Sequence, residues 1–404
     1  MSQPDSAFPS AERQETIDIL RGLALVLILV VHCAFDFTGW GWTIPKEALP
    51  GLPLAALDGS VAWALEFFLR EKSRALFALM FGVAFALQLQ RSQQLGEHFE
   101  RVFARRMAVL AVIGLLHGHL LYGFDVLRLY VIAGLLLLLL WRLPGRALWA
   151  MIAFATTLGP FLFFAIARML GMDLGGGMPD IAEIHAGHTS SSPLPLIALN
   201  HQLAMGLYLP VSLFGTVLPI LGCFLLGLWL ARTGWLQDAL SHRADLLRLT
   251  QRGLLFGLLL QGGSTLLWWL MGPQASPAHM VLAALMHFAA APVLALGYLG
   301  AVAVLATHPF WHAGLRWLAP AGRMTLTNYL MQSVLAWLIF YGVGLGLYGR
   351  IGPAVAVPIA LALALLQIGL SALWLRHHRL GPLEWLWRWA IRGVRPGWRR
   401  PVTA

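Results

Sequence analysis

Residues 17–38 read IDILRGLALVLILVVHCAFDFT, and they set the class of this protein. The run from Leu23 to Val31 is apolar at every position, without the alternation of apolar and polar residues that is typical of a membrane β-strand. Lipid offers no hydrogen-bonding partner to the backbone, so an apolar stretch of about 20 residues that crosses a bilayer forms an α-helix. The stretch therefore predicts a transmembrane helix.

The rest of the chain has the same character. Of its 404 residues, 59% are hydrophobic and only 11% are charged, and the mean hydropathy is +0.72; a soluble domain has roughly 25% charged residues. We predict an all-α, polytopic transmembrane helix bundle of about ten spans. The predicted spans are residues 17–38, 74–92, 103–122, 126–142, 147–169, 209–231, 248–271, 279–306, 323–343 and 354–375.

Segments outside these spans complete the predicted organisation. Segment 57–69 is too short to cross alone and is interpreted as an interfacial or re-entrant helix, or as an extra span. Residues 1–14 are expected to be disordered, 15–376 to form the bundle and 377–404 to form a basic, aromatic tail. No cleavage signal precedes the first apolar run, which is therefore expected to be an uncleaved anchor.

The basic residues predict the orientation of the bundle. With a cytoplasmic N-terminus, 21 of the 28 Lys and Arg residues fall on the cytoplasmic side, as the positive-inside rule requires. Both termini are then cytoplasmic, and the multi-pass protein belongs in a bacterial inner (plasma) membrane. The tail sequence WLWRWAIRGVRPGWRR, residues 385–400, is expected to contact anionic lipids, so the net charge of +10 does not indicate nucleic-acid binding.

Polar residues within the first span form one stripe. At 100° per residue, Asp18, Arg21, His32 and Asp36 share one face of an otherwise apolar helix. Polar groups at membrane depth are costly, which favours a functional interpretation. A purely structural interpretation is also open, in which Asp18 and Arg21 pair at i,i+3 and His32 is a hydrogen-bonded interior histidine.

His117 and His119 lie near the end of the third span, and Asp125 follows it. The two histidines are two residues apart and point in different directions on a helix, so they cannot bind one metal ion together, and we predict no metal site. One of the two histidines could instead face a central cavity with Asp125 orienting it, or both could simply bind carbonyl groups. The two cysteines, Cys33 and Cys223, lie inside predicted spans and indicate neither a disulfide nor a metal site.

Several sequence blocks resemble one family along nearly the whole chain. They are IDILRGLALVLILVVH (17–32), RALFALMFGVAFALQLQR (74–91), GLLHGHLLYGFDVLRLY (114–130), GRMTLTNYLMQS (322–333), IFYGVGLGLYGRIG (339–352) and WLRHHRLGPLEWLWRW (374–389). In this order they are similar to the YeiB-like family of bacterial inner-membrane proteins, labelled domain of unknown function 418, with the C-terminal signature within about 230–390. The first helix is also similar to that of the transmembrane acyltransferases, which include the acyltransferase-3 and heparan-alpha-glucosaminide N-acetyltransferase families.

This resemblance implies a function for the polar residues. Acyltransferase-3 proteins carry an Asp, an Arg and a His on the first helix, and Asp18, Arg21 and His32 stand at matching places. The resemblance implies an acyl-CoA-like donor reached from the cytoplasm and a catalytic histidine. YeiB-like relatives commonly have Asn where this chain has His32, which makes His117 the rival candidate.

We therefore expect a membrane-embedded acyltransferase that moves an acyl group to an extracytoplasmic hydroxyl or amine. His32 or His117 would act as the base, since a neutral imidazole suits that task, and Asp125 would orient it. Arg21, fixed by Asp18, would bind donor phosphates together with Arg105 and Arg106, and Asn328 is the candidate oxyanion donor. No permanently bound cofactor is expected.

Two other interpretations stay open at this stage. In a transporter or flippase, the same stripe would line a proton-coupled path for a small molecule or lipid. In a non-catalytic scaffold, the buried charges would only pair with one another, and removing the histidines would change stability alone.

Overall fold

The computed structural model describes residues 11–41, 43–44, 46–171, 179–206, 213–270 and 277–399. Within these ranges the protein is all-α, apart from one isolated β-bridge between His378 and Arg399. Most of the segment 1–14, the start of span 209–231 and the last five residues of the tail lie outside the described residues.

The described residues form a series of helices. In order they are α1 Ala11–Val31, which continues as a π-helical turn His32–Asp36; α2 Ala55–Phe68; α3 Arg70–Gln94; α4 Phe99–Leu120; α5 Leu127–Leu140; α6 Gly145–Ala153, a π-helical turn Phe154–Leu158 and α7 Gly159–Met169; α8 Ile181–Thr189; and α9 Pro193–Gly206. The second half comprises a π-helical turn Leu213–Val217 and α11 Leu218–Thr233; α12 Arg243–Leu270; α13 Pro277–Ala306; α14 Pro309–Leu315; α15 Ala319–Arg323; α16 Thr325–Ile339; α17 Pro353–His377; and α18 Pro382–Arg392. Short 3-10 helices lie at Lys46–Gly51 and Arg316–Leu318.

Seven helical segments among the described residues are long and apolar enough to cross a membrane. This confirms an all-α, multi-pass membrane protein. Each of the ten predicted spans overlaps at least one helix, but α4, α5 and α16 are not among the seven. Helix α4 carries four charged residues in its first eight, whereas α5 and α16 have 14 and 15 residues and reach only about 21–23 Å at 1.5 Å per residue.

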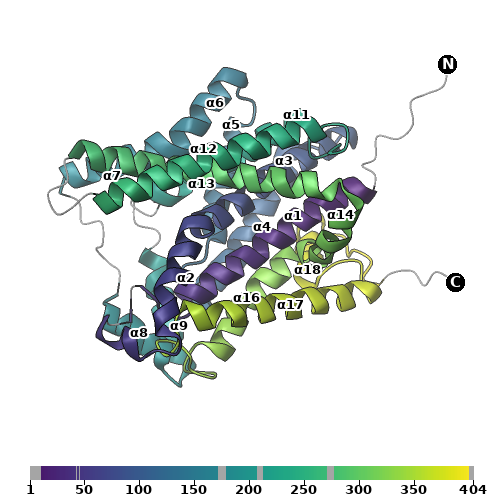
Figure 1. Ribbon diagram of the computed structural model, residues 1–404. Coiled ribbons are helices and arrows are strands. Elements are labelled where there is room, and N and C mark those ends of the chain that lie inside the picture. The colour runs from purple at the N-terminus through teal and green to yellow at the C-terminus, as the bar shows by residue number, and fades with distance from the viewer. Residues whose placement is uncertain are drawn as a thin grey trace, which may run out of the picture.

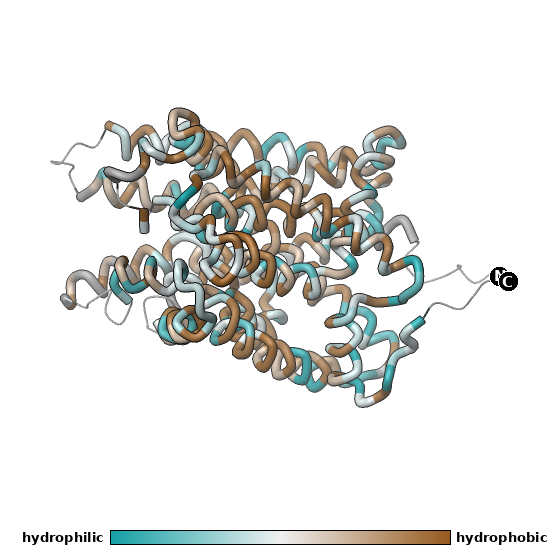
Figure 2. Tube along the Cα trace, turned by 90° about the horizontal axis from the view of Figure 1, so that it is seen from below, coloured by the Kyte–Doolittle hydropathy of each residue, from teal (hydrophilic) through white to brown (hydrophobic). Residues whose placement is uncertain are grey.

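Helix α1 runs through the middle of the bundle (Figure 1). It packs against α3 and α13 on one side and against α15, α16 and α17 on the other. The first turns of α1 and the C-terminal helix α18 lie at the same end of the bundle, and α2, α8 and α9 lie at the opposite end. Hydrophobic residues fill the middle of the bundle, and hydrophilic ones gather towards the end with the termini (Figure 2).

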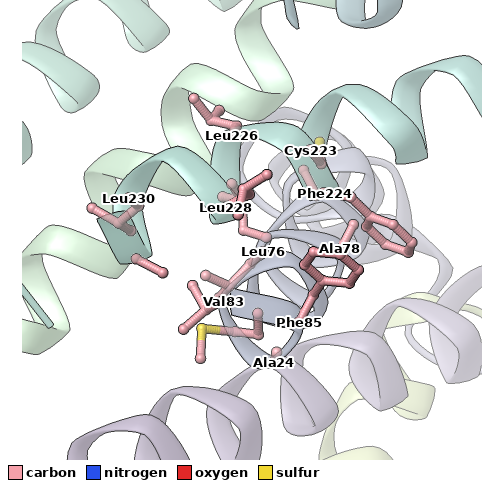
Figure 3. Close-up of a cluster of buried hydrophobic side chains, with 14 of the residues drawn as sticks. Ala24, Leu76, Ala78, Val83, Phe85, Cys223, Phe224, Leu226, Leu228 and Leu230 are labelled. Carbon is pink, nitrogen blue, oxygen red and sulfur yellow. The ribbon is translucent and has the colours of Figure 1, made fainter. Parts of the chain in front are cut away.

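Helices α3 and α11 form the centre of the largest hydrophobic cluster, which Figure 3 shows. Gly82 on α3 and Gly227 on α11 each face the backbone of the other helix so closely that a Cβ atom would overlap a carbonyl oxygen. Small residues of this kind are how membrane helices gain van der Waals contact when the hydrophobic effect contributes little.

A second close backbone contact joins α1 to α15. A Cβ atom on Gly22 would overlap the carbonyl oxygen of Leu318, and one on Gly322 would overlap that of Asp18. Each glycine stands beside an arginine, in Arg21–Gly22 and Gly322–Arg323. The contact therefore brings two arginines from distant parts of the chain to the same end of the bundle.

Helix α2, the predicted interfacial segment 57–69, closes the opposite end. It spans 14 residues and exposes Leu57, Trp63 and Phe68. Its Asp58 is fully buried and accepts a hydrogen bond of 2.8 Å from the backbone N–H of Ala354, in the first turn of α17. A carboxylate at this position satisfies an otherwise unpaired N–H group and interacts favourably with the helix dipole.

Helix α8 also packs at this end, through a buried histidine. The His188 ring lies 4.5 Å from the Tyr341 ring and 4.5 Å from the Tyr348 ring, and its Nδ1–H donates to the carbonyl oxygen of Ile184 at 2.9 Å. Burial lowers the pKa of His188 to about 4. The imidazole is therefore neutral at ordinary pH.

We predict that replacing Gly322 by Ala destabilises the bundle. The added methyl group must displace the α1 backbone, which costs about 1–3 kcal/mol for overpacking, whereas Gly314 on α14 has open space around its Cα atom. Thermal unfolding in detergent should show a lower midpoint for Gly322→Ala and an unchanged one for the control Gly314→Ala. Equal midpoints for the two variants would contradict the close contact.

We also predict acid-sensitive stability from His188. The pKa of His188 in the folded protein, about 4, lies below the ordinary value of 6.5. Its contribution to the free energy of unfolding is therefore fully present above pH 6.5 and is lost as the pH falls towards 4, by roughly 3 kcal/mol at most. The measurement compares the unfolding midpoints at pH 7.5 and pH 5. His188→Phe should lose part of this pH dependence, and an identical slope in both proteins would refute the assignment.

Candidate functional site

A cavity of about 760 Å³ opens at the end of the bundle where α1 begins and α18 lies. Its walls come from α1, α3, α4, α5, the segment 322–329 and the C-terminal residues 379–397. The fold therefore brings residues from both ends of the sequence together at one cavity.

The mouth of the cavity is strongly basic. Seven of the described lining residues are arginines, contributed by five parts of the chain: Arg21, Arg91, Arg106, Arg323, Arg379, Arg388 and Arg392. Asp18, Glu97 and Glu384 also line it, but Asp18 pairs with Arg21 at 3.5 Å and Glu384 is used as a helix cap. The excess of guanidinium groups is suited to a ligand with several negative charges.

The interior of the cavity is apolar and aromatic. Its lining includes Phe77, Met80, Phe81, Phe85, Phe103, Met107, Leu110, Tyr130 and Tyr329. A charged mouth above an apolar interior matches an amphiphilic ligand, with an anionic head and a hydrocarbon chain.

Beyond Tyr329 lies a buried hydrogen-bonded chain centred on His117. Its Nδ1 lies 2.8 Å from Asp125 Oδ1, and its Nε2 lies 2.9 Å from Ser333 Oγ. The His117 and Asp125 side chains are fully buried, and Ser333 is 4% exposed. An ionised carboxylate only accepts hydrogen bonds, so the neutral imidazole carries its proton on Nδ1, and its Nε2 lone pair faces the serine hydroxyl.

Asp125 has two further polar neighbours, although its Oδ2 accepts no hydrogen bond among the described residues. The Tyr329 hydroxyl donates to Asp125 Oδ1 at 3.1 Å, and Arg128 Nε lies 3.9 Å from Oδ2. Arg128 also donates to the carbonyl oxygens of Gly123 at 2.9 Å and Ala204 at 3.0 Å. The guanidinium therefore offsets the buried carboxylate while it ties α9 to α5.

Tyr329 connects this chain to the cavity. Its side chain lines the cavity, and its ring lies 5.4 Å from that of His117. Ser333 follows four residues later on α16, which places it on the same helix face one turn further from the mouth. The cavity and the His117 chain are thus consecutive along one helix.

His32, the other candidate base, lies in a separate but adjacent group. Its Nδ1 lies 2.5 Å from Asp36 Oδ2 and 3.1 Å from the Tyr122 hydroxyl, and its ring stacks on Phe37 at 5.6 Å. The Tyr122 ring lies 6.4 Å from His117. Tyr122 therefore stands between the two histidines. Neither histidine is among the described residues that line the cavity.

The other candidate residues divide between the cavity and its surroundings. Asp18, Arg21 and Arg106 line it. Arg105 is exposed on α4, and Asn328 is buried, with its Nδ2 donating to Ser371 Oγ at 2.9 Å; both lie outside the described lining. His119 lies near the surface, with its Nδ1 3.1 Å from that of His201. In the described ranges, no three His, Cys, Asp or Glu side chains are grouped closely enough to bind a metal ion.

Sequence reasoning missed Ser333, Tyr329 and the C-terminal arginines of the mouth. One signal for the first two was present, since Tyr329 and Ser333 stand four residues apart on the polar face that also holds Gln332. Nothing in the sequence indicates that this face meets His117, which is 216 positions away.

Helix α18 covers the mouth and is fastened by a carboxylate. Glu384 Oε1 accepts hydrogen bonds from the backbone N–H groups of Leu326 at 2.7 Å and Thr327 at 3.0 Å, and Oε2 accepts one from the Thr327 hydroxyl at 2.6 Å. These donors are the first turn of α16, where a negative charge is stabilised by the helix dipole. The Arg106 guanidinium also stacks on Trp387, 4.7 Å from the ring centroid.

The chain is similar to known proteins along almost its entire length. It is 31% identical to the uncharacterized protein YxaH of Bacillus subtilis, over 93% of this chain and 94% of that protein. It is 30% identical to the uncharacterized protein YeiB of Escherichia coli, over 93% of this chain and 96% of that protein. Residues 230–394 match the family described as protein of unknown function (DUF418).

The chain belongs to the DUF418 family. A third relative, an uncharacterized 39.9 kDa protein of Bacillus acidopullulyticus, is 27% identical over 93% of each chain. The part that matches the family model contains Arg323, Tyr329, Ser333 and Glu384. In this DUF418 protein the family region thus supplies α16 and the helix that covers the mouth, whereas His117 and Asp125 precede it.

We predict that Glu384→Ala loosens α18. Hydrogen bonds to a charged group contribute about 1.5–3 kcal/mol each, so their loss should raise the rate of limited trypsin cleavage after Arg388 and Arg392 by at least tenfold. Glu97→Ala is the matched control, because Glu97 also lines the cavity but its contact is a weak one, 3.4 Å from Ser92. Equal cleavage of both variants would show that Glu384 does not hold the helix.

Proposed function

We propose that this DUF418 protein is a membrane-embedded acyltransferase of the bacterial inner membrane. It takes an acyl group from an acyl-CoA-like donor and passes it to a hydroxyl or amine on the extracytoplasmic side. The observation that carries the proposal is the alignment of an amphiphilic cavity with a buried, oriented histidine, joined by Tyr329.

The proposed topology has ten spans with both termini in the cytoplasm. The support is the 21 of 28 basic residues on that side and the position of α18 beside the start of α1. The arginine-lined mouth then opens to the cytoplasm, where acyl-CoA is found. The group around His32, near the other end of α1, faces the extracytoplasmic side.

The proposed donor fits the cavity in charge and in polarity. The phosphates of a coenzyme A head would bind Arg21, Arg323 and the arginines of the tail, and Asp18 would hold Arg21 in place at 3.5 Å. The acyl chain would occupy the aromatic interior between α3 and α4. The indole N–H of Trp387 is buried in the lining and finds no acceptor among the described residues, so it is a further donor for a phosphate oxygen.

His117 would supply the base. Its Nε2 lone pair is free to take a proton because Asp125 holds the proton on Nδ1. This arrangement raises the basicity of the imidazole during the reaction and stabilises the imidazolium that forms. His32 would contribute to the acceptor side, since it lies across Tyr122 from His117.

We predict that Arg21→Ala and Arg323→Ala each weaken the binding of palmitoyl-CoA by about tenfold or more. Each removes charge-assisted hydrogen bonds worth about 1.5–3 kcal/mol, and 1.4 kcal/mol corresponds to tenfold in Kd. Isothermal titration of the purified protein measures this. Arg105→Ala, an exposed arginine of α4 outside the described lining, should bind as the wild type does.

Catalysis should depend on His117 more than on His32. We expect His117→Ala to lower transfer or hydrolysis of the acyl group by roughly 10²–10⁴-fold with donor binding intact, and His32→Ala to lower it far less. Release of the free coenzyme A thiol measures both. A wild-type protein that binds no acyl-CoA of any chain length would overturn the proposal, and binding without turnover would favour a transporter.

A further inference from the structure

Ser333 is a buried serine with its hydroxyl aimed at a histidine. Its Oγ lies 2.9 Å from His117 Nε2, and Asp125 Oδ1 lies 2.8 Å from the opposite ring nitrogen. The three side chains come from α16, α4 and the turn before α5. Their order is that of a nucleophile, a base and a residue that orients the base.

The direction of the hydrogen bonds supports this order. In the neutral imidazole with its proton on Nδ1 and pointing at the carboxylate, Nε2 accepts and the Ser333 hydroxyl donates to it. The Tyr329 hydroxyl donates to the same Asp125 Oδ1, and Arg128 Nε lies 3.9 Å from Oδ2, so both neighbours favour the orientation in which the carboxylate faces His117. The serine proton thus already lies on the path to the base.

We propose that Ser333 is the nucleophile that carries the acyl group between donor and acceptor, a step that rests on the proposed function. Ser333 Oγ attacks the carbonyl carbon of the thioester while His117 Nε2 takes the hydroxyl proton. The C–S bond breaks, and the leaving thiolate receives that proton, which leaves an ester on Ser333. The acceptor hydroxyl then attacks the ester carbonyl, His117 takes its proton, and the proton returns to Ser333 Oγ as the C–O bond breaks.

The position of Ser333 suits such a two-step transfer. The donor reaches it from the side of Tyr329, one helical turn nearer the cavity. Tyr122 and His32 lie on the other side of His117. An acyl group held on Ser333 passes from one side to the other without donor and acceptor ever meeting.

The first experiment treats the detergent-purified full chain with an alkyl fluorophosphonate, which forms a P–O bond with an activated serine and releases fluoride. Peptide mass spectrometry should locate the label on Ser333. Ser333→Ala should abolish it, and His117→Ala should slow it by roughly 10²-fold or more. Ser371→Ala is the matched control, because Ser371 is equally buried but bonds Asn328 instead of a histidine.

The second experiment quenches a reaction with radiolabelled palmitoyl-CoA in acid. Wild type should hold the label covalently, and Ser333→Cys should hold it as a thioester that neutral hydroxylamine releases, which also shows that a variant at this position folds. Two results would show that Ser333 is not the nucleophile without contradicting the proposed acyltransferase activity. One is the absence of phosphonate on wild-type Ser333, and the other is a Ser333→Ala protein that turns over palmitoyl-CoA at the wild-type rate. A protein labelled by phosphonate that neither binds nor turns over acyl-CoA would overturn the acyltransferase instead.

Discussion

The buried carboxylate of Asp125 joins the three helices of the candidate site, α4, α5 and α16. It is fully removed from solvent, and an unpaired charge at such depth would cost several kcal/mol. His117 from α4 and Tyr329 from α16 contact its Oδ1 by hydrogen bonds, and Arg128 from α5 places a positive charge 3.9 Å from its Oδ2. Because these three partners come from different helices, their contacts with one carboxylate constrain how the three helices are rotated relative to one another.

The same constraint explains why the cavity and the His117 chain lie in series. Rotating α16 to bring Tyr329 onto Asp125 also turns Ser333 towards His117, since the two residues share one helix face. At the mouth, Glu384 caps the first turn of this same helix and places α18 with its arginines over the opening. Helix α16 therefore links the charged tail, the apolar interior and the buried histidine.

Much of the architecture follows from the sequence, because lipid leaves few choices. An apolar run such as 17–38 has to be a helix, and polar residues inside such runs, including Arg21 and His117, stand out against their surroundings. The number of crossings is less readable, since α5 and α16 are short and the helices at residues 55–94 nearly merge. Helix length and helix kinks depend on packing, which a hydropathy pattern does not contain.

The assembly of the site could not be read in the same way. That Ser333 meets His117 depends on how two helices pack, and that Arg323 joins Arg21 depends on backbone contact at Gly22 and Gly322. These are pairings between positions hundreds of residues apart. Arg105 and Arg106 illustrate the limit, as adjacent arginines of one helix of which only Arg106 lines the cavity.

The most direct test is a cryo-electron microscopy structure of the protein with a thioether analogue of palmitoyl-CoA, which cannot release its chain. We expect phosphate density among Arg21, Arg323 and Arg388, the hydrocarbon chain between α3 and α4, and the carbonyl-equivalent atom within reach of Ser333 and His117. An analogue bound at the opposite end of the bundle, or with its head group away from these arginines, would contradict it.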